Sequence, residues 1–304
     1  MFELWVPVTI AAAFLQNLRS ALQKHLKGQL STSGATFARF GYGLPVAIIY
    51  VLILHYAVGF AWPTPSLEFV AWTAVGGASQ IAATALLVYL FGLRNFAVGT
   101  AYSKTETVQA AVFGAVFLGD SLSWPAILAI FISLVGVMAI SLAKTGGGLK
   151  NLKSAFFERT TAIGLLSGAL FGVSAVGYRG GSLTLAADDQ HFLMQAGYTL
   201  VWALAMQTVA MLIYIKLREP GEIKRIAKAW KVASIVGAAG ALGSVGWFTA
   251  MTIQNVAYVR ALGQIELVFT FIASTIFFKE TSTKGEVFGI VLIVVGILLL
   301  LLKG

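Results

Sequence analysis

The sequence contains no cysteine and few charged residues, and each shortage excludes a class of protein. Without cysteine the chain can form no disulfide, iron–sulfur site or thiolate zinc site. Its three histidines, His25, His55 and His191, lie far apart, and no pair has the spacing of metal ligands. Only 11% of the residues are charged, whereas a soluble domain has about a quarter. We therefore expect neither a metal site nor a water-soluble enzyme.

Apolar residues dominate what is present. They make up 58% of the 304 residues, and the mean hydropathy is +0.86. Distributed over spans of ~20 residues, this content suffices for about ten crossings of a bilayer. The formal net charge is +9, but lysine and arginine concentrate in loops, which indicates membrane topology and not nucleic-acid binding. Because no P-loop, HExxH motif or Ser/His/Asp grouping occurs, we expect no enzyme activity and no cofactor.

Ten apolar stretches predict an all-α integral membrane protein with ten transmembrane helices. The predicted helices cover residues 4–22, 35–54, 67–90, 98–117, 124–142, 161–178, 192–215, 230–250, 256–278 and 287–302. The polar, glycine-rich segment 144–160 lies between the fifth and sixth helices. We interpret this segment as a cytoplasmic linker between two halves.

The two halves are related in sequence. A shift of 160 residues places Asn95, Ala101 and Glu106 on Asn255, Ala261 and Glu266, without a gap from the third helix to the last. We therefore predict two five-helix repeats, 1–143 and 161–304. Because five is odd, the second repeat is inverted relative to the first. Basic residues follow the odd-numbered helices, and Arg179 alone follows an even one, so the positive-inside rule predicts that both termini are non-cytoplasmic.

Several polar and charged residues lie inside the predicted spans. The fourth helix carries Lys104 and Glu106, and the ninth carries Arg260, Gln264 and Glu266. A charge in the hydrocarbon core costs at least about 2.5 kcal/mol, so each needs a partner, a cavity or a function. At ~100° per residue, Lys104 lies about 200° from Glu106, and Glu266 the same angle from Gln264. Both helices are then polar on two sides and must be central.

Two interpretations of the carboxylates remain open. In the structural one, Glu106 and Glu266 each pair with a buried arginine or cap a broken helix. In the functional one, at least one of them binds substrate or titrates a coupling proton at a midplane site between repeats. The recurrent glycines have a simpler explanation, because small residues allow helices to approach closely. These glycines are Gly237, Gly240, Gly243 and Gly246 in the eighth span and Gly168 and Gly172 in the sixth.

The chain resembles the drug/metabolite transporter superfamily, specifically the EamA-type ten-helix transporters. The resemblance rests on the paired halves, on Arg39 at the start of the second helix, and on the pattern that ends each repeat, such as Leu118-Gly119-Asp120 before a helix that contains Gly136. It departs from the family at Thr105-Glu106-Thr107, where a proline is usual. The resemblance implies a central cavity, exposed alternately by rocking of the halves. The cavity candidates are Gln80, Tyr102, Lys104, Glu106, Trp247, Tyr258, Arg260, Gln264 and Glu266.

Our first hypothesis for function is a secondary transporter of a small polar metabolite, such as an amino acid or related zwitterion, with protons at Glu106 or Glu266 as a coupling partner. An alternative is an anionic cargo, such as an organic phosphate or nucleotide sugar, held by Lys104, Arg260 and Arg19. A third is a non-transporting membrane receptor or assembly protein. We expect a multi-pass protein of the plasma membrane (the inner membrane in a bacterium) that is a monomer or homodimer.

Overall fold

The computed structural model describes residues 3–26, 29–91, 103–145, 159–185, 191–272, 275 and 282–303. Within these ranges the chain is helical apart from short connections, which confirms the predicted all-α fold. The helices are α1 Trp5–Leu26, α2 Thr32–Gly41, α3 Gly43–Tyr56, α4 Leu67–Phe91, α6 Glu106–Leu118, α7 Trp124–Thr145, α9 Arg159–Thr184, α10 Phe192–Arg218, α11 Glu222–Lys228, α12 Trp230–Ile253, α13 Val256–Gly263, α14 Ile265–Ile272 and α15 Lys284–Lys303.

Each predicted span coincides with at least one of these helices. Seven helical segments in the described part of the chain are long and apolar enough to cross a bilayer, and one of them joins α2 and α3. The first, fourth and ninth predicted spans do not meet that standard. The first is α1, which carries Arg19; the fourth is the shorter α6; the ninth is divided into α13 and α14. Predicted residues 98–102, most of 273–278 and the linker residues 146–158 lie outside the described ranges.

The helices form two compact units. The first comprises Met1–Ala78 and Gly177–Gln254, and the second comprises Ser79–Val176 and Asn255–Gly304. Each unit thus combines segments from both sides of the predicted linker. The boundaries of the two sequence repeats and their inverted relation stay predictions.

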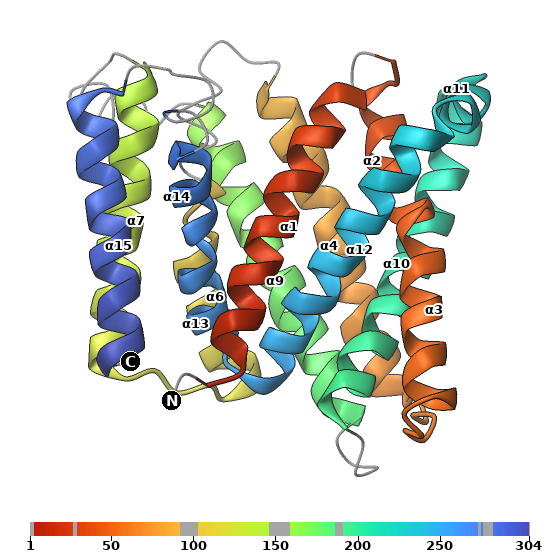
Figure 1. Cartoon of the computed structure of the whole chain (residues 1–304), viewed down its shortest axis with the longest axis horizontal. Coiled ribbons are helices and arrows are strands. Elements are labelled where there is room, and N and C mark those ends of the chain that lie inside the picture. Colours follow the sequence, from red (N-terminus) through yellow and green to blue (C-terminus); the bar gives the residue numbers. More distant parts are fainter. Residues whose placement is uncertain are drawn as a thin grey trace. The chain divides into compact units, whose positions relative to one another are not determined.

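In the first unit, the glycine stripe of α12 packs against α1 and the start of α3. A Cβ added to Gly246 would lie 2.8 Å from the Ala12 Cβ, and one added to Gly237 would lie 2.5 Å from the Tyr42 backbone. The short distance at Gly246 shows that α1 and α12 lie side by side at close range (Figure 1), where a larger residue would not fit. The contacts confirm that these glycines serve helix packing.

Arg179, which seemed an exception to the charge pattern of the loops, is part of a helix. The sixth predicted span ends at Tyr178, but α9 continues to Thr184. The Arg179 guanidinium donates hydrogen bonds to the Met251 carbonyl at 2.6 Å and to the Gln254 carbonyl at 2.5 Å. The last carbonyls of a helix have no partner within it, so Arg179 caps the C-terminus of α12.

In the second unit, α7 and α15 lie side by side (Figure 1). A Cβ on Gly136 would lie 2.6 Å from the Gly289 carbonyl oxygen, so these two helices touch backbone to backbone. The glycines of α9 pack similarly on the fourth predicted span, because a Cβ on Gly168 would lie 2.8 Å from the Ser103 carbonyl oxygen. The packing role predicted for Gly168 and Gly172 is therefore confirmed, and Gly168 supports the turn that carries the charged residues.

Candidate functional site

The fourth and ninth predicted helices are interrupted at equivalent positions. Ser103 is helical, Lys104 and Thr105 form a turn, and α6 begins at Glu106. In the ninth, α13 ends at Gly263, Gln264 lies in a turn, and α14 begins at Ile265. The shift of 160 residues that relates the halves superimposes Lys104 on Gln264. Both interruptions place polar side chains at a helix start, as in the discontinuous helices of transporter binding sites.

Two ion pairs join these interruptions. Lys104 Nζ lies 2.8 Å from Glu266 Oε1, and Arg260 Nε lies 3.2 Å from Glu106 Oε1. The pairs are crossed, because each predicted repeat supplies one cation and one carboxylate and every partner comes from the other repeat. We refer to Lys104, Glu106, Arg260 and Glu266 as the crossed ion pairs.

A third polar contact lies between the ion pairs. The Gln264 side-chain amide donates to Thr107 Oγ1 at 3.1 Å. Arg260, Gln264 and Glu266 therefore all contact the segment 103–107, whereas the sequence analysis assigned Gln264 and Glu266 to opposite helix faces. That assignment assumed an uninterrupted helix with ~100° per residue. The turn at Gln264, between α13 and α14, interrupts that regular helix.

The four charges are only partly accessible. The side chains of Arg260, Glu106 and Glu266 are 19%, 18% and 16% exposed, and that of Lys104 is 31% exposed. Lys104 also interacts electrostatically with Glu106 and Arg260, so the pairs form one network of zero net charge. Glu106 and Glu266 lie in the first turns of α6 and α14. A carboxylate is favoured there, because the helix dipole places partial positive charge at the N-terminus.

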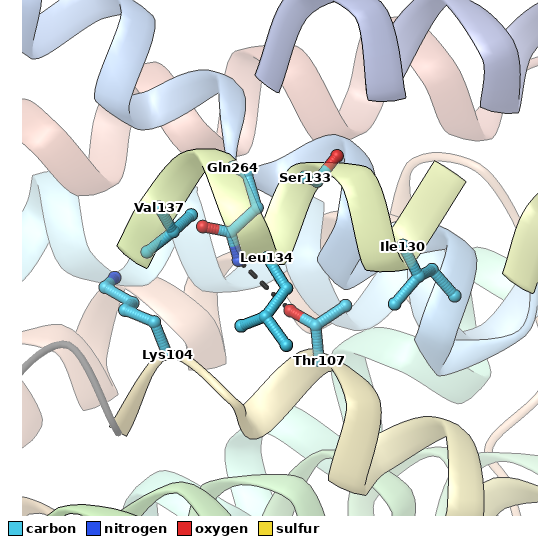
Figure 2. A pocket seen from close by; sticks show the side chains of 7 residues that line it. All are labelled: Lys104, Thr107, Ile130, Ser133, Leu134, Val137 and Gln264. Atoms are coloured by element: carbon cyan, nitrogen blue, oxygen red, sulfur yellow. Dashed lines mark hydrogen bonds between the residues drawn. The ribbon is translucent and has the colours of Figure 1, made fainter. Parts of the chain in front are cut away.

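A narrow crevice adjoins this network (Figure 2). It is lined by Lys104, Thr107 and Gln264 and by the α7 residues Ile130, Ser133, Leu134 and Val137. Figure 2 shows the Gln264 amide directed toward Thr107 across the crevice. Two buried polar atoms beside it, Gln264 Oε1 and Ser133 Oγ, have no hydrogen-bond partner among the described residues. The crevice has no room for a water molecule in this conformation.

The other sequence candidates lie elsewhere or are not described. Tyr258, 8% exposed, donates its hydroxyl to Ser123 Oγ at 3.4 Å, in the loop before α7. Gln80 is in the part of α4 that belongs to the second unit. Trp247 is buried in the first unit, and Tyr102 lies outside the described residues. For these four residues a role in substrate binding stays a prediction.

Sequence reasoning did not single out Thr107 or Ser133. Both are buried polar residues in apolar helices, 4% and 2% exposed, and both border the crevice. Hydroxyl residues often satisfy their own helix, so their presence in a span gives no sign of a site. Only the tertiary packing of α6, α7 and α13 brings them beside Gln264.

A family model and a solved structure match this chain. Residues 161–302 match the model of the EamA-like transporter family. No curated protein matches the sequence. A solved crystal structure is similar over 98% of this chain and 96% of its own, with a TM-score of 0.72 and 15% sequence identity. At that identity the likeness shows the fold alone.

Proposed function

We infer that this chain, a member of the EamA-like transporter family and hence a multi-pass membrane transporter of the drug/metabolite transporter superfamily, carries a small zwitterionic metabolite such as an amino acid. The crossed ion pairs are its substrate site. The observation that supports this most strongly is the placement of two cations and two carboxylates at two equivalent helix interruptions, only partly exposed.

The charge balance favours a zwitterion over the other cargo considered. A zwitterion can replace both halves of an ion pair, because its carboxylate takes the place of a glutamate and its ammonium takes the place of the lysine or arginine. An anion such as an organic phosphate requires a net positive site, but Glu106 and Glu266 neutralise Lys104 and Arg260. The family match argues against a non-transporting receptor or assembly protein.

Transport then proceeds by exchange of partners within the network. With both pairs formed, the crevice beside Gln264 is too narrow for water, so a substrate can enter it only after the pairs open. Binding of a zwitterion opens the Lys104–Glu266 and Arg260–Glu106 contacts in the course of alternating access. Opening of a pair also frees a carboxylate, and this is the step at which Glu106 or Glu266 accepts a coupling proton.

The remaining properties follow from the sequence pattern. The basic loops after the odd-numbered helices support non-cytoplasmic termini in the plasma membrane, or the inner membrane of a bacterium. Two complete repeats in one chain support a transport path within a monomer, whether or not two chains associate.

Solute counterflow in proteoliposomes tests the proposal. Vesicles with wild-type protein are loaded with unlabelled amino acids, and uptake of a labelled one is followed. We expect uptake above protein-free vesicles for at least one amino acid, and a loss of at least about tenfold in Glu106→Gln and in Glu266→Gln. Glu68→Gln, which removes an exposed carboxylate at the start of α4, is the matched control. Wild-type counterflow rates in both Glu106→Gln and Glu266→Gln would refute the proposed site.

A further inference from the structure

In the connection between α10 and α12, the basic side chains are exposed and the acidic ones are buried or half-buried. It contains two acidic residues, Glu219 and Glu222. Six basic residues lie within it or in the adjoining ends of α10 and α12: Lys216, Arg218, Lys224, Arg225, Lys228 and Lys231. All six basic residues are exposed, whereas Glu222 is completely buried and Glu219 half-buried. We call the six residues the basic surface of α11.

The acidic residues are held inward by the start of α2. Ser31 donates its backbone N–H to Glu222 Oε1 at 2.6 Å and its hydroxyl to Glu219. Ser31 is also the N-cap of α2, so both carboxylates lie at a helix N-terminus, where negative charge is stabilised. Gly34 leaves the room that Glu222 needs, because a Cβ there would overlap its carboxylate.

Most of the basic residues are left without a nearby carboxylate from this connection. Arg225 Nε pairs with Glu222 Oε2 at 2.9 Å, but its side chain is 60% exposed. Ile226 is buried in the core that α11 shares with α2 and α12, whereas Lys224 and Lys228 are exposed. The outward side of the connection is therefore strongly cationic.

Large apolar side chains are exposed beside these cations. Leu217 is 74% exposed, Trp230 55% and Ile223 41%. Only residues 219–229 connect the spanning helices α10 and α12, so the connection must lie at the membrane surface. Tryptophan favours that depth, and lysine and arginine beside apolar anchors are typical of segments that lie in the interface of an anionic membrane.

We propose that the basic surface of α11 is a binding site for anionic phospholipid headgroups, in which the cations contact the phosphates and Trp230, Ile223 and Leu217 enter the interface. The carboxylates of Glu219 and Glu222 hold α11 against the start of α2, so the basic surface is preformed before lipid binds. This site is independent of the crossed ion pairs and of the substrate. An acidic protein partner could use the same charge, but the exposed apolar residues at headgroup depth favour lipid.

Lipid-dependent thermal stabilisation of the whole protein in detergent tests the site. Phosphatidylglycerol is titrated against phosphatidylcholine as the neutral control. We expect phosphatidylglycerol to raise the melting temperature more, and the preference to fall in 0.5 M salt because exposed charges are screened. In Lys224→Gln/Lys228→Gln/Lys231→Gln, the half-saturating phosphatidylglycerol concentration should rise at least about tenfold, since each charge near an anionic surface contributes about fivefold. The triple arginine variant at the same positions should behave as wild type.

A second measurement keeps the proposal testable should the glutamine variant fail to fold. Quenching by brominated phosphatidylglycerol and brominated phosphatidylcholine is compared in wild type and Trp230→Phe, and the difference reports on Trp230. We expect Trp230 to be quenched more by the anionic lipid. Equal quenching by both lipids, or equal stabilisation of the glutamine and arginine variants, would overturn the proposal. Equal stabilisation by both lipids together with binding of an acidic polypeptide would assign the surface to a protein partner, and this result would also overturn the proposal.

Discussion

Removing both members of one of the crossed ion pairs should destabilise the protein by less than the sum of the two single removals. At 2.8 Å, two unit charges attract by about 6 kcal/mol at an effective dielectric constant of ~20. Desolvation of both groups offsets most of this gain. The side chains of Lys104 and Glu266 are also 31% and 16% exposed, which weakens the pair toward the value of a surface ion pair. We expect a net coupling of about 2 kcal/mol.

A double-mutant cycle measures this coupling. The free energies of unfolding of Lys104→Gln, Glu266→Gln and the double variant are compared in mixed micelles of increasing denaturing detergent. Each single variant leaves one partly buried charge without its partner and should lose about 2 kcal/mol or more, and the double variant should lose less than the sum of the two. The Arg260–Glu106 pair, at 3.2 Å, provides an internal replicate. Coupling below about 0.5 kcal/mol in both cycles would refute the reasoning.

Three further predictions concern helix packing and helix capping. Gly168→Ala should reduce counterflow severalfold, because its Cβ would lie 2.8 Å from the Ser103 carbonyl oxygen and displace the turn that carries the charges. Gly77→Ala, whose Cβ would meet nothing nearer than 4.0 Å, should retain transport. Equal counterflow rates in the two variants would contradict this prediction. Arg179→Ala should lower the free energy of unfolding by about 2–3 kcal/mol through loss of two charge-assisted hydrogen bonds, with Arg179→Lys less affected; an unchanged value would exclude the cap. Gly136→Ala should lower the melting temperature by overpacking against α15, at a cost of about 1–3 kcal/mol, and an unchanged melting temperature would contradict close contact.

The fold was largely predictable from the sequence because its signals are local. Apolar runs of about 20 residues mark spanning helices, and small residues at regular spacing mark close packing. The contacts of Gly168 and Gly246 follow from that pattern. The end of α9 was not predictable, because Arg179 resembles a loop residue until its two carbonyl partners on α12 are known.

The candidate site was predictable in composition but not in pairing. Charges inside apolar spans identified Lys104, Glu106, Arg260 and Glu266, and helix geometry excluded a pair between Lys104 and Glu106 within one helix. The actual partners are 162 residues apart for Lys104 and Glu266, and no local pattern specifies such a contact. A broken helix was one of the interpretations left open, but its position at Gln264 was not predictable, because neither proline nor a glycine pair marks that residue.

The central claim, that the crossed ion pairs hold a zwitterion, is tested most directly by calorimetric binding to the wild-type protein in detergent. An amino acid that supports counterflow is compared with the matching amine, which lacks the carboxylate, and the matching carboxylic acid, which lacks the ammonium. We predict that the amino acid binds at least about tenfold more tightly than either analogue, and that Glu266→Gln removes this preference. Equal or tighter binding of the carboxylic acid would contradict the account, because it would show that the network acts as an anion site.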